Sequence, residues 1–114
     1  MTRSKYGAVK TTVDGIRFDS KQEAARYQEL LLLVTAGEIR ALELQPRYPL
    51  MVEGQKVGTY VADFRYHVVA EDATVVEDSK GMPTPVYKLK KKLMWAIYGI
   101  VIHETYWIKH RRDR

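Results

Sequence analysis

The chain has 114 residues, an apolar fraction of 46%, no cysteine and a formal net charge of +5. These values favour one globular domain over residues 1–114 and exclude a disulfide framework or a thiolate metal site. The apolar run Leu30–Val34 is too short to span a membrane, and the first residues lack a secretory signal. We therefore expect a cytoplasmic protein without a membrane partner, and the basic charge favours a nucleic acid.

The N-terminal part is predicted to hold a basic arm and a short hairpin. Residues 1–10 carry three cationic side chains and little apolar content. Thr11–Val13 and Ile16–Phe18 then flank Asp14-Gly15, a dipeptide that tolerates positive φ. This pattern is typical of a tight two-residue turn between strands.

The first helix is predicted to begin after Ser20 and to end at Gly37. Ser20 and Glu23 have the spacing of a capping box, and glycine is the usual residue after a helix C-terminus. Apolar residues at three-to-four spacing would face the core: Ala24, Tyr27, Leu30, Leu31 and Val34. Glu23 thus lies at the buried end of this helix, although its role is also explained by the cap alone.

The following segment is predicted to be a series of strands. Ile39–Leu44 alternates and favours a strand, while Pro46 and Pro49 indicate an edge or bent strand. Leu50–Val52 precedes a turn over Glu53–Lys56, and a long strand is expected from there onward.

The centre of the sequence reads as a long hairpin. Tyr60–Val69 alternates with period two and is rich in aromatic and β-branched residues, and a second run covers Thr74–Lys80. Ala70–Ala73 is the predicted loop between them. If the residues flanking this loop pair, Asp63 lies opposite Lys80 and Arg65 lies opposite Asp78. The hairpin would then gather two carboxylates and a lysine on one face.

These residue types suit metal-assisted phosphodiester cleavage. Asp63 and Asp78 offer hard oxygen ligands for Mg²⁺, and Lys80 offers a positive group beside the phosphate. The backbone carbonyl of Ser79 is a further candidate ligand, and Glu23 would complete an acidic cluster. Crowded carboxylates are costly without a cation, which favours a metal site. An ordinary surface salt bridge between aspartate and lysine remains the simpler alternative.

Other acidic and imidazole side chains are weaker candidates. Glu77 points to the opposite face and is expected to be solvated or helix-facing, with a ligand role only if a bulge shifts the register. His67, His103 and His110 show no metal-ligand spacing, so a zinc site is not expected.

A second helix is predicted between Thr84, as its cap, and Gly99, with Pro85 at its first position. Its core-facing stripe is expected to be Val86, Leu89, Leu93 and Ile97. Ile100–Ile108 is predicted to be a strand, and residues 109–114 a basic tail.

Four lysines of this second helix are candidate contacts to the DNA backbone: Lys88, Lys90, Lys91 and Lys92. A solvated lysine-rich face is the alternative explanation. Trp95, Tyr98 and Trp107 are candidate interface residues for a homodimer. The whole order is helix, strands, helix and strand, which predicts an α/β (α+β) fold with a mixed sheet flanked by helices.

The acidic pattern also resembles a known superfamily. Glu23 on a helix, Asp63 on a strand and Asp78-Ser79-Lys80 on the next strand resemble the PD-(D/E)XK nucleases, with Ala62 at the place of the proline. The blocks FDSKQEAARYQEL, YVADF, VVEDSKG and YKLKKKLM resemble small phage and prophage endonuclease-like proteins. The resemblance to phage junction-resolving endonucleases is more distant.

This resemblance implies a restriction-endonuclease-like core of helix, three antiparallel strands, helix and strand. It implies a Mg²⁺-dependent endodeoxyribonuclease of a bacterial host or its phage, with Mn²⁺ as a substitute and no organic cofactor. Asp63 and Asp78 would bind the metal, Glu23 would be a ligand or a supporting acid, and Lys80 would position the water. Lys88 or Lys91 would contact phosphates.

Three functions therefore stay open at this point. The first is a dimeric endonuclease selective for branched DNA such as a Holliday junction, or weakly sequence-specific. The second is a non-catalytic nucleic-acid-binding module that uses the basic helix. The third is an acidic-cluster nuclease acting on RNA.

Overall fold

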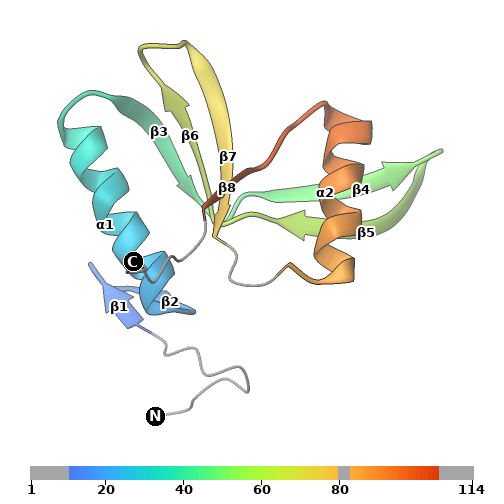
Figure 1. Ribbon diagram of the computed structural model, residues 1–114, viewed down its shortest axis with the longest axis horizontal. Helices are drawn as coiled ribbons and strands as arrows, with labels where there is room; N and C mark the ends of the chain where they lie inside the picture. Colours follow the sequence, from blue (N-terminus) through green and yellow to red (C-terminus); the bar gives the residue numbers. More distant parts are fainter. Residues whose placement is uncertain (1–10, 80–82, 106–114) are drawn as a thin grey trace, which may run out of the picture.

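The computed structural model describes residues 11–79 and 83–105 and has an α+β architecture (Figure 1). Its two helices are α1 (Lys21–Thr35) and α2 (Pro85–Tyr98). Its strands are β1 (Thr11–Val13), β2 (Ile16–Phe18), β3 (Ile39–Leu44), β4 (Arg47–Val52), β5 (Gln55–Val61), β6 (Phe64–Val68), β7 (Ala73–Ser79) and β8 (His103–Thr105). The predicted arm, the tail, Lys80, Trp107 and His110 lie outside the described residues.

The local signals at the turns and helix ends are confirmed. Asp14 and Gly15 both have positive φ, of 52° and 78°, in the β1–β2 turn. The Ser20 hydroxyl accepts the backbone N–H of Glu23 at 3.1 Å at the start of α1. Gly99 ends α2 with a φ of 68°. The conformation at these positions depends on the type of the local residue, and it could therefore be predicted from the sequence.

The main sheet has four strands in the order β3-β6-β7-β8. Its first three strands are antiparallel, and β8 runs parallel to β7. Figure 1 shows α1 and α2 on opposite sides of this sheet. No helix in the described part of the chain is long and apolar enough to cross a membrane.

Each helix covers its own apolar core. The α1 core joins Ala24, Tyr27 and Leu30 to strand residues such as Phe64 and Tyr66. The α2 core gathers buried residues of α2, β4, β5, β7 and two connecting segments: Tyr48, Leu50, Tyr60, Ala62, Val76, Tyr87, Met94 and Ile102. The sheet therefore separates two layers, and successive residues of β7 face different cores.

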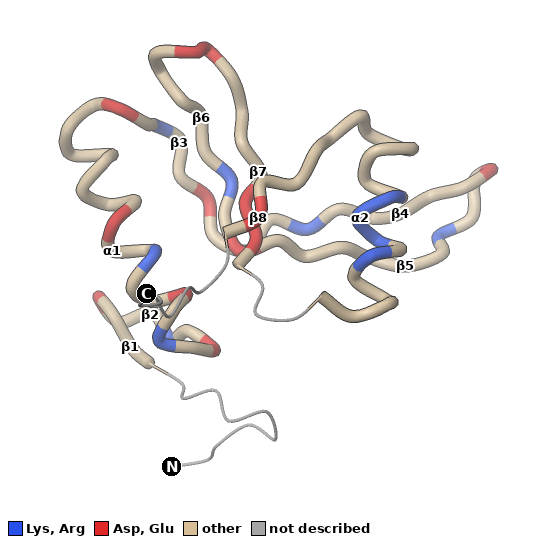
Figure 2. The backbone as a smooth tube through the Cα atoms, in the orientation of Figure 1, with Lys and Arg blue, Asp and Glu red and all other residues tan. Residues whose placement is uncertain are grey.

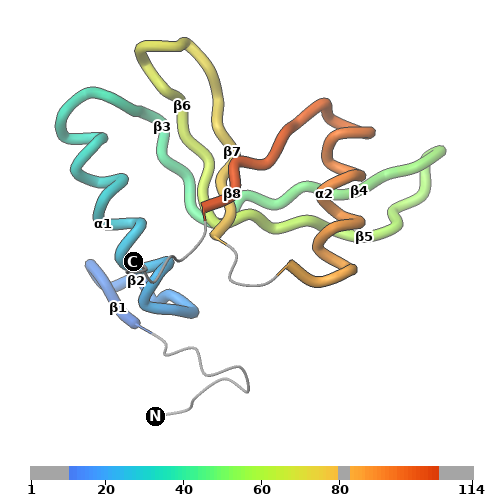
Figure 3. Tube along the Cα trace, in the orientation of Figure 1, coloured from blue at the N-terminus to red at the C-terminus, as the bar shows by residue number. Residues whose placement is uncertain are grey.

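The prediction of one long strand through Tyr60–Val69 is wrong, because the strand is interrupted at Asp63. β5 pairs only with β4 in a separate ribbon, whereas β6 pairs with β3 and β7. The partner chain is interrupted at the same level, where Gln45 has a φ of 50° and Pro46 has no N–H to donate. Backbone hydrogen bonds join the two bends, from Gln45 to Asp63 at 2.9 Å and from Ala62 to Pro46 at 3.1 Å. Figure 3 shows both bends at one place in the molecule.

The predicted turn over Glu53–Lys56 is shorter in the structure. Glu53 and Gly54 alone form it, with φ values of 51° and 80°, and β5 begins at Gln55. Two consecutive residues with positive φ are typical of a type I′ turn, which matches the twist of a two-stranded ribbon.

The predicted register of the central hairpin is wrong by two residues. Phe64 pairs with Glu77 and Val68 with Ala73, so the loop covers residues 69–72. Asp72 takes the positive φ of 50° that closes this loop, a conformation that aspartate tolerates better than the alanine after it. A shift of two residues keeps every side chain on its predicted face.

The predicted core stripe of α2 is also wrong in part. Val86 and Leu89 are exposed, and the buried positions are Tyr87 and Met94. The long tyrosine and methionine side chains fill the α2 core, and the two smaller aliphatic residues lie on the outer face. Leu93 and Ile97 do pack against the core, as predicted.

The predicted strand Ile100–Ile108 is shorter within the described residues. Residues 100–102 are not in a strand, and β8 covers only His103–Thr105 before the description ends. Ile102 is buried in the α2 core. The chain thus leaves α2 through an apolar connection and pairs only where it reaches β7.

A buried ion pair joins α1 to the sheet. Glu77 of β7 is fully buried, and both its carboxylate oxygens accept from the Arg26 guanidinium, at 2.7 and 2.9 Å. The Tyr66 hydroxyl donates to the same carboxylate at 2.6 Å. Bidentate geometry and a third donor satisfy this charge, which anchors α1 and fixes which face of β7 it covers.

Arg26→Met is expected to destabilise the protein by about 3 kcal/mol, because it leaves the buried Glu77 carboxylate without its counter-ion. Equilibrium urea unfolding measures the loss. The double variant Arg26→Met/Glu77→Leu should recover part of it, since it removes the uncompensated charge. A double variant less stable than Arg26→Met would contradict this assignment.

Candidate metal site and basic groove

Two aspartates meet where the strands bend. Asp63 occupies the bend between β5 and β6, and its N–H donates to the carbonyl of Glu77 at 3.1 Å. The observed register, continued by one residue, places Asp63 opposite Asp78. The backbone N–H of Ser79 donates to the Asp63 carboxylate at 2.7 Å. The structure therefore brings the two predicted carboxylates together on one face.

Their proximity has a large effect on Asp63. Burial, followed by the negative charges of Asp78 and Glu23, raises the pKa of Asp63 from 3.8 to about 8. The hydrogen bond from the Ser79 N–H acts in the other direction, and a carboxyl–carboxyl hydrogen bond with Asp78 raises the value further. In the absence of a cation, the raised pKa therefore favours the protonated form of Asp63 near neutral pH.

Asp78 is held by a tyrosine that the sequence did not indicate. Asp78 is 1% exposed, and the Tyr60 hydroxyl donates a hydrogen bond to its carboxylate. Burial, and then this bond to Asp78, raise the pKa of Tyr60 well above its ordinary value, so the phenol keeps its proton. A continuous strand would place Tyr60 on the face opposite Asp63. The bend at Asp63 brings Tyr60 to Asp78 instead.

Glu23 contributes charge to the site from the start of α1. It is buried, and its pKa is raised by burial, by Asp19 and by Asp78. Its carboxylate also accepts from the Gln45 side chain and from the Asp19 backbone, which lowers the pKa. Glu23 is thus within electrostatic reach of the aspartates, while part of its bonding capacity is already used.

The donor set fits a hard divalent cation held by two carboxylates. Mg²⁺ commonly takes one or two protein carboxylates and keeps several waters. Within residues 11–79 and 83–105, no three acidic or imidazole side chains converge closely enough to hold a metal ion together. Asp63 and Asp78 are therefore the two candidate ligands, and Ser79 is fixed beside them through its N–H.

The remaining candidate ligands lie elsewhere. Glu77 was predicted to be either solvated or helix-facing, and it faces α1. Its two carboxylate oxygens bind Arg26 and are therefore not directed toward the aspartates. The Nε2 atom of His67 lies 2.9 Å from an Asp72 carboxylate oxygen, at the β6–β7 loop. His103 is exposed at the start of β8.

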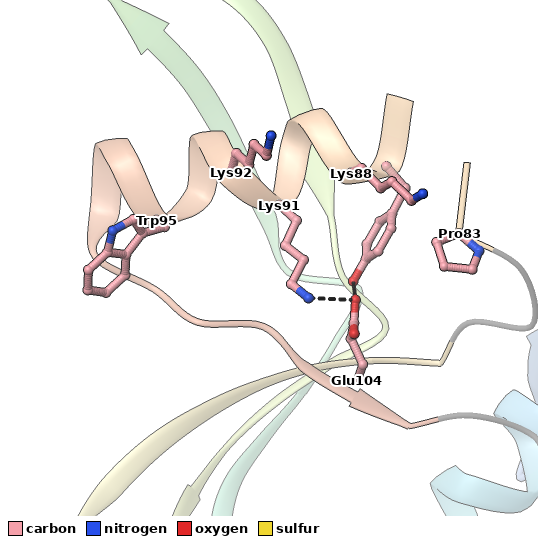
Figure 4. Close-up of a pocket in the computed structure, with 7 residues that line it drawn as sticks. Pro83, Lys88, Lys91, Lys92, Trp95 and Glu104 are labelled. Carbon is pink, nitrogen blue, oxygen red and sulfur yellow. Dashed lines mark hydrogen bonds and ion pairs between the residues drawn. The ribbon is translucent and has the colours of Figure 1, made fainter. Parts of the chain in front are cut away.

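The predicted lysine face of α2 divides into two hollows. Lys88, Lys91 and Lys92 line one groove of about 540 Å³ together with Trp95 (Figure 4). Lys90 lines a separate hollow beside Tyr60. Figure 2 shows the cationic segment of α2 across from the acidic segments of β7 and β8.

Glu104 forms the floor of the groove and was not anticipated from sequence. It is aligned with Asp78 across the parallel β7–β8 pair. Its carboxylate accepts from the Tyr87 hydroxyl at 2.6 Å and lies 3.0 Å from the Lys91 amine. Glu104 lies in a segment that was predicted to be a strand, but the sequence did not indicate that this strand pairs with β7 and aligns Glu104 with Asp78.

Asp63→Asn is expected to raise the melting temperature by about 5 °C at pH 9 in a chelator. Because the folded-state pKa of about 8 exceeds the ordinary value, folding takes up a proton between pH 4 and 8. Stability from this group is therefore present at low pH and is lost as pH rises through about 8. The variant should lose this pH dependence, as followed by circular dichroism.

The exposed residue Glu71 provides the matched control, since Glu71→Gln removes a carboxylate from the β6–β7 loop. That variant should keep the pH dependence of the parent. An Asp63→Asn protein whose stability changes with pH as the parent's does would refute the carboxylate pairing.

Comparison with known proteins gives one match. Neither the curated proteins nor the solved structures match the chain. One family model, described as a protein of unknown function (DUF1064), matches residues 3–112, which include both aspartates, the lysines of α2 and Glu104. The chain belongs to the DUF1064 family.

Proposed function

We propose that the protein is a Mg²⁺-dependent DNA endonuclease of phage or prophage type. The observation that carries this proposal is the pairing of Asp63 with Asp78 in a half-buried bend, where burial and mutual charge raise the pKa of Asp63 to about 8. Two carboxylates held this closely repel each other unless a proton or a cation lies between them. A divalent cation bound in place of the proton would offset the repulsion between the two negative charges.

The remaining residues have consistent roles in this proposal. A bound Mg²⁺ would polarise the scissile phosphate and activate a water molecule. Asp63 and Asp78 would hold it, and the Tyr60 hydroxyl would fix the orientation of the Asp78 carboxylate. Glu23 would act as a supporting acid, because no three acidic or imidazole side chains of the described residues converge closely enough to hold a metal ion.

Lys80 completes the proposal from its place in the sequence. It lies two residues after Asp78 and outside the described residues. An ammonium group there would orient the attacking water and offset charge at the phosphate in the transition state. This role follows from the resemblance of Asp78-Ser79-Lys80 to the nuclease motif.

The topology supports the same proposal. A helix, three antiparallel strands, a helix and a further strand parallel to the third follow one another as α1, β3, β6, β7, α2 and β8. This is the order that a restriction-endonuclease-like core requires. The β4–β5 ribbon is an addition between the first and second strands of that core.

DNA is the proposed substrate because cationic residues lie beside the acidic pair. The chain carries a net charge of +5, and three lysines of α2 line one groove. Lysine contacts to phosphates give sequence-independent affinity, which suits an enzyme that recognises DNA shape. Branched DNA, including the Holliday junction, is the substrate suggested by the resemblance to junction-resolving endonucleases.

A homodimer belongs to this proposal, since cuts in two strands call for two sites related by two-fold symmetry. Of the residues predicted for a dimer interface, Tyr98 is exposed on α2, and Trp107 lies outside the described residues. The Tyr98 hydroxyl donates to the carbonyl of Pro49 at 2.5 Å, which fixes this ring at the surface.

A non-catalytic nucleic-acid-binding module is the second candidate. The specific observation that favours it is that no third acidic side chain joins Asp63 and Asp78 closely enough to form a metal site among the described residues. In that case the two aspartates would share a proton and serve only the structure, while the lysines of α2 bind the polyanion.

Cleavage assays separate the two candidates. With Mg²⁺ or Mn²⁺, the protein should nick supercoiled plasmid and cut a four-way junction, and chelator should abolish both reactions. Asp78→Asn and Lys80→Ala should each lower the rate by about 100-fold or more, because each removes several kcal/mol of transition-state stabilisation. Binding to the same DNA in a gel-shift assay should persist in both variants.

Glu53→Gln is the control for these variants, since Glu53 lies in the exposed β4–β5 turn. Its cleavage rate should equal that of the parent. Full cleavage by Asp78→Asn would remove the aspartates from the chemistry. DNA binding without cleavage, with either metal, would favour the non-catalytic module.

Metal binding has a readout that does not depend on cleavage. Mg²⁺ at pH 8 should raise the melting temperature of the parent protein, because a ligand that binds the folded state stabilises it by mass action. Asp63→Asn and Asp78→Asn should each show a much smaller increase. An equal Mg²⁺-induced increase in both variants and the parent would place the ion elsewhere.

A further inference from the structure

The groove on α2 combines an exposed aromatic ring with a row of cations. Lys88, Lys92 and Trp95 follow one another at intervals of four and three residues, so they lie along one face of the helix. Trp95 is 61% exposed, although tryptophan has the largest apolar surface to bury. An indole left in solvent at the end of a row of cations calls for a binding partner.

The charges of the groove are not equivalent. Lys91 points to Glu104 and forms an ion pair with it, whereas Lys88 and Lys92 point away from that carboxylate (Figure 4). Neither Lys88 nor Lys92 has an ion pair within the described residues. Two ammonium groups without an ion pair among the described residues therefore line the groove, and Lys92 lies one helical turn from the indole.

This chemistry selects a nucleotide strand over other occupants. Each nucleotide offers a negative phosphate for an ammonium group and a planar base for an aromatic ring, and stacking of this kind is largely independent of sequence. An apolar helix or a second copy of this basic chain would bury ammonium groups without partners. Bases within a duplex are already stacked on each other, so the indole requires an unpaired base.

The groove is connected to the acidic pair through ordered contacts. Glu104 on the groove floor is aligned with Asp78 on the adjacent strand. The Tyr87 ring, whose hydroxyl donates to Glu104, lies 6.4 Å from the ring of Tyr60, and Tyr60 donates to Asp78. A DNA strand lying along the groove would therefore lie beside Glu104, one β-strand away from Asp78.

We propose that Trp95 stacks on an unpaired base while Lys88 and Lys92 contact its phosphates, so that the preferred DNA has single-stranded nucleotides next to the cut. The inference rests on the proposed function for the position of the cut, but the binding of unpaired nucleotides is independent of catalysis. We therefore expect the protein to prefer flapped or splayed DNA to a fully paired four-way junction.

Tryptophan fluorescence tests the stacking directly. The chain has two tryptophans, so Trp107→Phe leaves Trp95 as the single fluorophore. In chelator, a short oligothymidylate should quench the Trp95 fluorescence until binding is saturated. A duplex of equal length should leave most of the fluorescence unquenched. Quenching must be independent of protein concentration, because quenching by self-association would assign the ring to a dimer interface and overturn the proposal.

Variants separate stacking from charge. In fluorescence anisotropy with a labelled oligothymidylate, Trp95→Leu should weaken binding about fivefold or more, whereas Trp95→Phe should retain most of the affinity. Lys92→Ala should weaken binding and reduce the salt dependence by about one ion. Lys56→Ala is the matched control, since Lys56 is an exposed lysine of β5 outside the groove, and its salt dependence should change less.

Cleavage then completes the test. The parent should cut a splayed-arm DNA faster than a four-way junction, and Trp95→Leu should remove this difference. Quenching by oligothymidylate without cleavage of any DNA would uphold the groove and reject the nuclease. Cleavage that is equal on paired and unpaired DNA and unaffected by Trp95→Leu would reject the groove and uphold the nuclease.

Discussion

Electrostatic repulsion between Asp63 and Asp78 is the constraint on which the rest of the molecule depends. The two carboxylates lie close together, one on β7 and one at the bend before β6. Burial and the charge of Asp78 disfavour the ionised form of Asp63 and raise its pKa. A fold that only required stability would gain by replacing either residue with an amide. Under the proposed function, a divalent cation bound by both carboxylates would relieve this repulsion.

The paired bends of the backbone create that position. Both neighbouring strands break at one level, at Gln45-Pro46 and at Ala62-Asp63, and hydrogen bonds across the break hold them together. Above the break the strands belong to the main sheet, and below it they form a separate ribbon that packs against α2. The irregular backbone at this break therefore places Asp63 between the main sheet and the β4–β5 ribbon.

Much of the local structure could be predicted from the sequence because it depends on neighbouring residues. Capping by Ser20, the Asp14-Gly15 turn and the helix end at Gly99 are all set within a few positions. Side-chain parity was also predictable, so Asp63 and Asp78 were expected on one face. The alternation of residues along a strand survives a register shift of two, and this is why the face was right although the partners were wrong.

The other parts of the site depend on contacts between distant segments. Tyr60 and Glu104 reach the acidic residues only because β5 leaves the sheet and β8 joins it in parallel. The alternation of residues continues unbroken through Asp63, and only the neighbouring bend has a local signal, at Pro46. Likewise, exposure of Val86 and burial of Tyr87 follow from how α2 lies on the ribbon, which periodicity alone leaves undetermined.

The neighbouring residues Glu77 and Asp78 show what this arrangement implies for sequence change. One is neutralised by a guanidinium on the α1 side, and the other faces an aspartate on the opposite side. Deleting a single residue early in β7 would exchange their orientations, so that the carboxylate matched to Arg26 would be the wrong one. A change in the length of β7 would therefore disable helix attachment and the acidic site simultaneously.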